Sequence, residues 1–396
     1  MKRTVCGVVA IAASVFFLMS CGGGSTPSSS GPPPTSLLTK RAFVTNEFAG
    51  TVQIVDAMTD KLSSHTITTG TSPQTIVVSG DKKASLVFNA GGNTVTLVEN
   101  ASESAIATAT LADYTDSLAI SSDGKKAYAA IRNAPSATGT PLGVVAFVDF
   151  GAGTNTSVDV PLARRLVLGP NGAKLLVFSD NSDSVTVIDT ATKGMTVVGG
   201  FDRPVWGVFA SDSSKAYIMN CGPECGGTTA SVTELDNLGG VPSLGPNAMV
   251  SAATIGLLDG TTLYVAGTVP TVGGRLDVLS TSGVLNVSKS GVPINDGYHT
   301  TMAISNGRVF VGARACSNVT EGCLSIFNTS TATSCALPVI CAPKGEVTGM
   351  QAISGRAIVY VVEGGELRIY DSSTSTEKLP LPVDIVGKAW DVKTVD

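Results

Sequence analysis

The chain has 396 residues, of which 43% are hydrophobic, only 14% are charged and 44 are glycine. Low charge together with abundant Gly, Thr, Ser and Val favours β-structure over helix, and the length is ample for a large core. The formal net charge of −5 and the lack of a long basic run argue against a nucleic acid as partner.

The first 20 residues are typical of an export signal. Lys2 and Arg3 form a short basic segment, and residues 5–18 form an apolar segment too short to span a membrane comfortably. The following LMSC, residues 18–21, resembles a bacterial lipobox. The resemblance implies cleavage before Cys21, a diacylglyceryl thioether on its sulfur and an acyl chain (palmitate) on the new amino terminus. The alternative is an ordinary secretory signal followed by an incidental cysteine.

A linker follows the lipidated cysteine, so we divide the chain into a signal (1–20), a lipidated Cys with linker (21–36) and a folded domain (37–396). The linker sequence GGGSTPSSSGPPPTS is flexible where it is rich in Gly and Ser and extended where prolines follow one another. Glycine at position 22, rather than aspartate, implies by the same resemblance export to the outer membrane. Removal of Lys2 and Arg3 takes the formal charge from −5 to −7.

Internal repetition is the strongest signal in the folded domain. A short apolar strand, a polar turn and a second, alternating strand follow one another eight times. The residues that close the second strand lie 40 to 50 positions apart: Asp56, Glu99, Asp149, Asp189, Asp236, Ser280, Asn328 and Asp371. Most units also carry a turn rich in Gly, Asp or Asn further on, such as SGDKKA (79–84) and GPNGAK (169–174). Each unit is therefore predicted to hold about four short strands.

Units of this length with four strands are typical of the blades of a β-propeller. A single four-stranded sheet cannot bury both of its faces, so such units must pack side by side round an axis. The units resemble the YVTN-type (WD40-like) repeat, through Val44-Thr45-Asn46, Ile54-Val55-Asp56, Val187-Ile188-Asp189 and the Asp123-Gly124 turn. The resemblance covers residues 41–396, is weakest in repeats five to seven, and implies an all-β fold.

The ends of the domain indicate how the ring closes. The chain enters on a strand at 41–46 that is second in its unit, and it leaves on a strand at 389–395 that has the phase of a first strand. The C-terminal strand is therefore predicted to complete the blade that the N-terminus begins, which leaves no exposed edge. Eight blades fit best, and seven are the alternative if repeat five or six is degenerate.

Six cysteines follow the linker, as three close pairs: Cys221 with Cys225, Cys316 with Cys323, and Cys335 with Cys341. In an exported chain this arrangement favours three local disulfides. A redox site would need CxxC spacing at a helix start, and zinc would need four convergent ligands although the chain has only two histidines. We therefore expect structural bridges and no metal site built from these cysteines.

Propellers bind ligands at the central channel, so the residues just before each innermost strand are the informative ones. Both tryptophans, one histidine and the only Arg-Arg pair fall at this phase of the repeat. The candidates for a ligand site at the channel rim are Asp116, Arg164, Arg165, Trp206, Tyr298, His299, Glu346, Trp390 and Asp391. Aromatic and guanidinium groups around one opening could hold a planar or anionic ligand. The alternative is structural: tryptophans that wedge neighbouring blades and Arg–Asp pairs that satisfy the channel wall.

No catalytic constellation stands out in the sequence, so two functions remain open. The first is a non-catalytic binding or scaffold module, monomeric, without a cofactor, held on a lipid bilayer through acylated Cys21 in the bacterial cell envelope, with an envelope protein or a glycan as possible partner. The second is an enzyme at the channel, such as a lactonase-like hydrolase or, less consistent with the motifs, a quinone-dependent dehydrogenase. Asp116, Glu346 and Asp391 could supply carboxylates to a channel calcium in that case.

Overall fold

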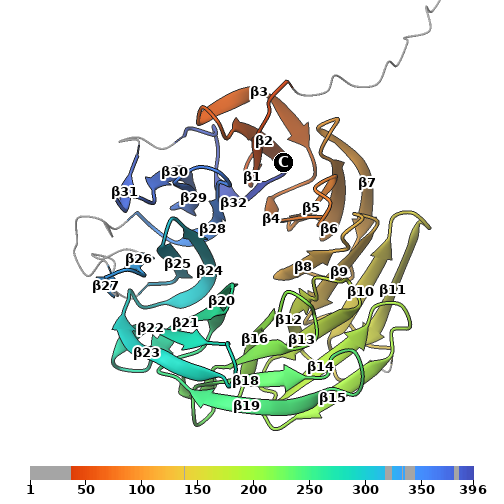
Figure 1. The fold of residues 1–396 in the computed structure, drawn as a ribbon. Helices are drawn as coiled ribbons and strands as arrows, with labels where there is room; N and C mark the ends of the chain where they lie inside the picture. The colour runs from red at the N-terminus through yellow and green to blue at the C-terminus, as the bar shows by residue number, and fades with distance from the viewer. Residues whose placement is uncertain (1–36, 138, 317–322, 332, 335–343, 379–382) are drawn as a thin grey trace, which may run out of the picture. The chain divides into compact units, whose positions relative to one another are not determined.

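A computed structural model describes residues 37–137, 139–316, 323–331, 333–334, 344–378 and 383–396. The propeller is one compact unit, Thr35–Asp396. Its described residues form eight four-stranded antiparallel sheets arranged as blades of a ring (Figure 1). This confirms the predicted all-β propeller and the count of eight blades rather than seven.

The blades are numbered in chain order, and their strands are given from the axis outwards. Blade 1 consists of β32 (Ala389–Thr394), β1 (Arg41–Asn46), β2 (Thr51–Asp56) and β3 (Lys61–Thr68), and blade 2 of β4 (Pro73–Val78), β5 (Ala84–Asn89), β6 (Thr94–Glu99) and β7 (Ser104–Thr110). Blade 3 consists of β8 (Ser117–Ile120), β9 (Lys126–Ile131), β10 (Val144–Asp149) and β11 (Thr154–Asp159), and blade 4 of β12 (Ala163–Leu168), β13 (Lys174–Ser179), β14 (Ser184–Asp189) and β15 (Met195–Gly199). Blade 5 consists of β16 (Pro204–Phe209), β17 (Ala216–Asn220), β18 (Ser231–Asp236) and β19 (Ser243–Met249), and blade 6 of β20 (Ile255–Asp259), β21 (Thr262–Val269), β22 (Gly273–Ser280) and β23 (Asn286–Pro293). Blade 7 consists of β24 (Tyr298–Ser305), β25 (Arg308–Arg314), β26 (Leu324–Asn328) and β27 (Thr333–Ser334), and blade 8 of β28 (Val347–Ala352), β29 (Ile358–Glu363), β30 (Glu366–Asp371) and β31 (Thr376–Glu377).

The recurring Asp or Asn of the repeat ends a strand because its side chain starts the next turn. All eight residues that mark the repeat are the last residues of the third strand of their blade. The Oδ1 atom of Asp56 accepts a hydrogen bond from the Met58 amide at 2.9 Å, and Asp189 Oδ1 accepts one from the Thr192 amide at 2.8 Å. A short polar side chain that binds the backbone two or three residues ahead turns the chain back into a hairpin.

The hydrophobic core is divided among the gaps between neighbouring blades. The second strand of blade 1, RAFVTN, is buried at every position, whereas the outermost strand of blade 3 begins with four exposed residues. A buried apolar cluster fills each of the gaps between successive blades, including the gap between blades 8 and 1. Each blade therefore buries both faces only because it has a neighbour on each side.

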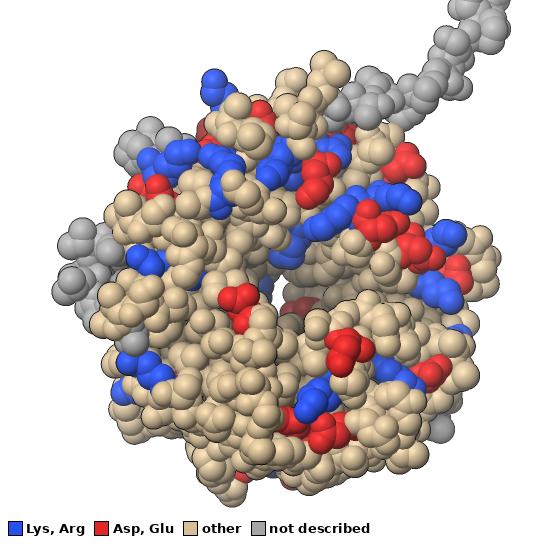
Figure 2. All heavy atoms as spheres, in the orientation of Figure 1, with Lys and Arg blue, Asp and Glu red and all other residues tan. Residues whose placement is uncertain are grey.

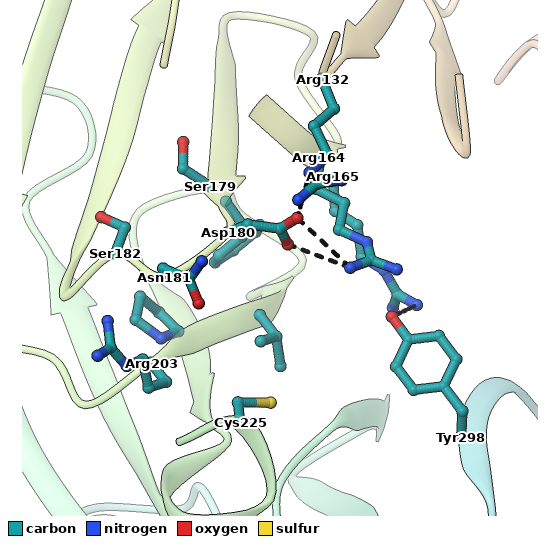
Figure 3. A pocket seen from close by; sticks show the side chains of 13 residues that line it. Arg132, Arg164, Arg165, Ser179, Asp180, Asn181, Ser182, Arg203, Cys225 and Tyr298 are labelled. Atoms are coloured by element: carbon teal, nitrogen blue, oxygen red, sulfur yellow. Dashed lines mark hydrogen bonds and ion pairs between the residues drawn. The ribbon is translucent and has the colours of Figure 1, made fainter. Parts of the chain in front are cut away.

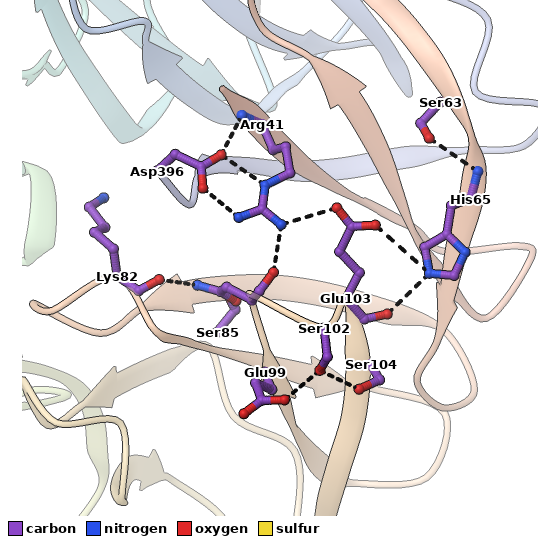
Figure 4. Close-up of polar contacts among 11 residues, drawn as sticks. Arg41, Ser63, His65, Lys82, Ser85, Glu99, Ser102, Glu103, Ser104 and Asp396 are labelled. Carbon is purple, nitrogen blue, oxygen red and sulfur yellow. Dashed lines mark hydrogen bonds and ion pairs between the residues drawn. The ribbon is translucent and has the colours of Figure 1, made fainter. Parts of the chain in front are cut away.

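The C-terminal strand closes the ring as the sequence predicts. Strand β32 pairs antiparallel with β1, so the blue end of the chain lies beside its beginning in Figure 1. A side-chain clasp reinforces this pairing (Figure 4). The Arg41 backbone amide and Nε both donate to Asp396 Oδ2, at 2.7 and 2.9 Å, and its Nη1 reaches Glu103 Oε1 of blade 2 at 3.0 Å.

The two ends of the ring differ because every innermost strand runs in the same direction. We call the end where these strands begin the loop face, and the end where they turn back the turn face. The loop face carries the connections between second and third strands, among them the 3-10 helix η1 (Gly222–Cys225). The propeller's first described residues lie at the turn face, where the Lys40 ammonium contacts the Ser354 carbonyl.

Two of the three predicted disulfides are present, and both lie in loop-face connections. Cys221 is bonded to Cys225, and Cys316 to Cys323. The predicted pair of Cys335 and Cys341 falls outside the described residues. Within the described ranges, no helix is long and apolar enough to cross a membrane.

Candidate functional site

The ring is hollow at its centre, and basic side chains reach the rim of the opening (Figure 2). A cavity of about 420 Å³ lies there, and we call it the channel cavity. Its walls come from the innermost strands, or the residues next to them, of every blade except blade 6: Thr75, Ile76, Val77, Tyr114, Asp116, Ser117, Leu118, Arg164, Arg165, Leu166, Trp206, Tyr298, Thr300, Thr301, Arg314, Thr348, Trp390, Asp391 and Lys393.

Seven of the nine residues proposed from the sequence line this one cavity. They are Asp116, Arg164, Arg165, Trp206, Tyr298, Trp390 and Asp391. The other two, His299 and Glu346, are not among its lining residues. The repeat phase therefore brings together most of the rare aromatic and basic side chains, although it does not show what they bind.

His299 lies next to Tyr298 but turns into the protein. Its side chain is 1% exposed, and its Nε2 lies 3.0 Å from the Asn295 carbonyl oxygen. Burial lowers the pKa of His299 to about 4, so the imidazole is neutral near pH 7. Adjacent residues of a strand point to opposite sides, which is why only one of the two reaches the channel.

The carboxylates do not gather at one point. Asp391 accepts hydrogen bonds from the Ile76 amide at 3.2 Å and from the Lys393 ammonium at 2.8 Å. Glu346 accepts one from the Ala315 amide at 3.2 Å, in a loop of blade 7. Among the residues that the structure describes, no three His, Cys, Asp or Glu side chains are placed to hold a metal ion.

Arg165 is held between two aromatic rings. Its guanidinium carbon lies 5.4 Å from the centre of the Trp206 ring and 5.1 Å from that of Tyr298. Its Nη2 also donates to the Tyr298 hydroxyl at 2.7 Å (Figure 3). Because Arg165 belongs to β12 of blade 4 and Tyr298 to β24 of blade 7, this contact reaches across the channel. Stacking fixes the guanidinium plane and leaves donors available to a ligand.

A second aromatic group repeats this chemistry on the other side of the ring. Arg314 and Lys388 lie 5.0 and 4.9 Å from the centre of the Trp390 ring. Tyr114 stands nearby on the rim, and burial together with the neighbouring Asp116 raises its pKa to about 12, so it remains a neutral hydrogen-bonding group.

A further cavity, of about 320 Å³, opens beside the channel at the loop face, and we call it the mouth pocket. Arg132 and Arg164 both form ion pairs with Asp180 there, the latter at 3.2 Å (Figure 3). Arg165 and Arg203 complete a set of four arginines around that single lining carboxylate. Arg132 and Asp180 were not among the residues predicted from the sequence, because they lie in connections between second and third strands rather than at the repeat phase that marks the channel.

Several residues of the channel wall carry a buried polar atom that has no hydrogen-bond partner in the protein. The indole Nε1 of Trp206 and the Nε of Arg314 are two such donors, and the hydroxyls of Thr300 and Thr348 are two more such groups. Buried polar groups are normally hydrogen-bonded, so each of these atoms keeps the capacity for one more hydrogen bond. The arrangement can therefore bind through stacking, charge and hydrogen bonds.

By fold the chain is an eight-bladed β-propeller, and comparison with solved structures agrees. The dihydro-heme d1 dehydrogenase NirN, solved in complex with DHE, is similar at a TM-score of 0.67 and 14% identity, over 92% of this chain and 77% of that one. The periplasmic gluconolactonase PpgL of Pseudomonas aeruginosa gives 0.54 and 16%, over 90% and 99%. The Cps50 (Swd1) β-propeller domain of Myceliophteria thermophila gives 0.53 and 12%, over 74% and 93%.

Sequence identities of 12 to 16% show that the folds are similar and show nothing about a shared function. No protein-family model matches the sequence, and no curated protein matches it either. The function must therefore be argued from the chemistry of the channel.

Proposed function

We propose that the protein is a binding module of the bacterial cell envelope that holds an anionic ligand in its central channel. The observation that carries this proposal is the charge of the channel cavity. Four basic side chains line it together with two carboxylates, in a domain whose formal charge is −7. Arginines that are already stacked on aromatic rings lose little freedom when they bind, which favours a carboxylate, sulfonate or phosphate as ligand.

The export signal and the lipobox support attachment of this module to a bilayer through acylated Cys21. The linker at 22–36 then acts as a tether, and glycine at position 22 favours the outer membrane. Replacement of Cys21 with Ser should release the protein from the membrane fraction; if the variant stays there, lipidation at Cys21 is refuted.

The binding role is preferred over a hydrolase for chemical reasons. A lactonase-like site would need a base with a second catalytic group, or a metal, at the channel. His299 is buried away from the channel, and Asp391 is engaged by Lys393 and a backbone amide. Asp116 remains on the channel wall beside the Tyr114 hydroxyl, and the described residues place no three metal ligands together. The similarity to a gluconolactonase is one of fold.

The anion proposal can be tested through the fluorescence of the protein itself. Both tryptophans of the chain line the channel cavity, so a ligand bound there changes their emission. We expect benzoate or naphthalene sulfonate to bind and their neutral amides not to, and Arg165→Gln to weaken anion binding about tenfold. Arg275→Gln, on β22, is a matched control outside both cavities. Equal binding of the amides, or no effect of Arg165→Gln, would overturn the proposal.

A further inference from the structure

The wall of the channel changes character between its two ends. Next to the turn face lies a third cavity of about 360 Å³, which we call the funnel. Most of its lining is aliphatic and comes from the innermost strands of blades 2 to 4, including Val77, Leu118, Ala119, Val167 and Leu168. Val77, Ala119, Val167 and Leu168 are only partly buried, so the funnel exposes apolar surface to its interior.

The funnel and the channel cavity adjoin each other. Val77, Leu118, Leu166 and Trp206 line both of them. Along β12 alone the wall passes from Arg165 to Leu168, which is about 10 Å at the usual rise of a strand. A cationic, aromatic compartment thus lies directly beside an aliphatic one.

The funnel takes its aliphatic wall from three neighbouring blades. Val77, Ala119 and Val167 stand opposite the third residue of the second strand in blades 2, 3 and 4. In blades 8 and 1 the same position carries Gln351 and Lys393. Blades 6 and 7 carry the apolar Leu257 and Ala303 there. Val77, Ala119 and Val167 also pack against the clusters between blades, and what distinguishes them is that their exposed parts line a cavity next to the cationic one.

We propose that the ligand is a linear anionic amphiphile, with a carboxylate or phosphate head and an aliphatic chain. The head binds Arg165 and the neighbouring basic groups, and the chain lies along β12 into the funnel beside Trp206. This inference rests on the proposed function, since it takes the anion site as given and adds the apolar half of the ligand. Charge complementarity fixes the position of the anionic head group, and burial of the ligand's aliphatic chain supplies most of the binding free energy.

Tryptophan fluorescence also tests this inference, because Trp206 stands where the two compartments meet. The chain from Thr35, which contains the whole ring and its core, is titrated without detergent with dodecanoate, butyrate and methyl dodecanoate, each below the concentration at which it aggregates. We expect dodecanoate to bind at least about 100-fold more tightly than butyrate, because eight additional methylenes gain an apolar surface. Methyl dodecanoate, which lacks the charge, binds weakly. Dodecyl phosphate then distinguishes a phosphate head from a carboxylate.

Two variants separate the head from the chain. Val78→Thr combined with Val167→Thr, at two positions that line the funnel and not the channel cavity, keeps the shape of the wall but makes the funnel polar. It weakens dodecanoate binding about tenfold while leaving butyrate unchanged. Arg165→Gln weakens both. Val197→Thr on the exposed outer strand β15 is the matched control.

Equal affinities for butyrate and dodecanoate, both lowered by Arg165→Gln, would overturn the amphiphile and leave the anion site standing. Equal affinities for dodecanoate and its methyl ester, unaffected by Arg165→Gln, would overturn both proposals.

Discussion

Arg41 joins the first strand of the ring to the last residue of the chain and to blade 2. The Arg41 side chain is 8% exposed, and the Glu103 side chain, whose carboxylate it contacts at 3.0 Å, is 6% exposed. Arg41→Met keeps the aliphatic stem but leaves this carboxylate buried without its cation, which costs about 3–5 kcal/mol in comparable pairs. The contact with Asp396 adds less, because that carboxylate is 24% exposed. We expect the free energy of unfolding to fall by about 4 kcal/mol.

Urea denaturation of the chain from Thr35, followed by circular dichroism, measures this loss. The double variant Arg41→Met/Glu103→Gln removes the unpaired charge and should recover about 2 kcal/mol of it. Lys83→Met is the control, because Lys83 is 83% exposed and lies 3.7 Å from Asp81, so its loss costs less than about 1 kcal/mol. If Arg41→Met is as mild as this control, or if the double variant is less stable than the single one, the buried pair does not hold the ring closed.

Two further changes test other parts of the ring. Burial raises the pKa of Glu363 to about 7 from its ordinary 4.5, although Tyr370 donates to it at 2.9 Å. The folded state therefore binds the Glu363 proton more tightly than the unfolded state does, and the free energy of unfolding falls as the pH rises from about 4.5 to about 7. Glu363→Gln removes this loss, so it should raise the free energy of unfolding at about pH 8 by up to about 3 kcal/mol. It should change that free energy little near pH 4. If the free energy of unfolding depends on pH in the same way in Glu363→Gln and in the parent, the prediction is wrong. The double variant Cys221→Ser/Cys225→Ser should lower the free energy of unfolding by about 2 kcal/mol, because the disulfide closes only a short loop. Urea unfolding of the variant and of the oxidised parent measures this difference. A larger loss would show that Glu224, whose carboxylate accepts a hydrogen bond from Thr254 Oγ1 at 2.7 Å, also moves.

The blades were predictable because their information is local. A few adjacent residues determine each hairpin. Alternation of apolar and polar side chains predicts the strand, and an Asp or Asn at its end predicts the turn. Even where the repeat is weakest, Ser280 and Asn328 end their strands at the expected positions. Closure was predictable as well, since only the phase of the two end strands was needed.

The site was only partly predictable, because a repeat phase fixes where a backbone lies and not where a side chain points. Tyr298 and His299 share the phase, yet one faces the channel and the other is buried. The contact between Arg132 and Asp180 joins loops of two different blades, so no spacing in the sequence marks it. The aliphatic funnel was missed for another reason: its valines look like any core residue until the ring shows which of them line a cavity.

The pairing of β32 with β1 makes the ring's assembly depend on its final residues. The second, third and fourth strands of blade 1 are synthesised first and carry an unpaired inner edge until residues 389–394 arrive. A chain cut short before that point keeps this edge open, and open strand edges recruit other chains. Copies truncated before this strand should therefore aggregate during biogenesis rather than accumulate as seven-bladed rings, so the closing strand acts as a check that all eight blades have been made.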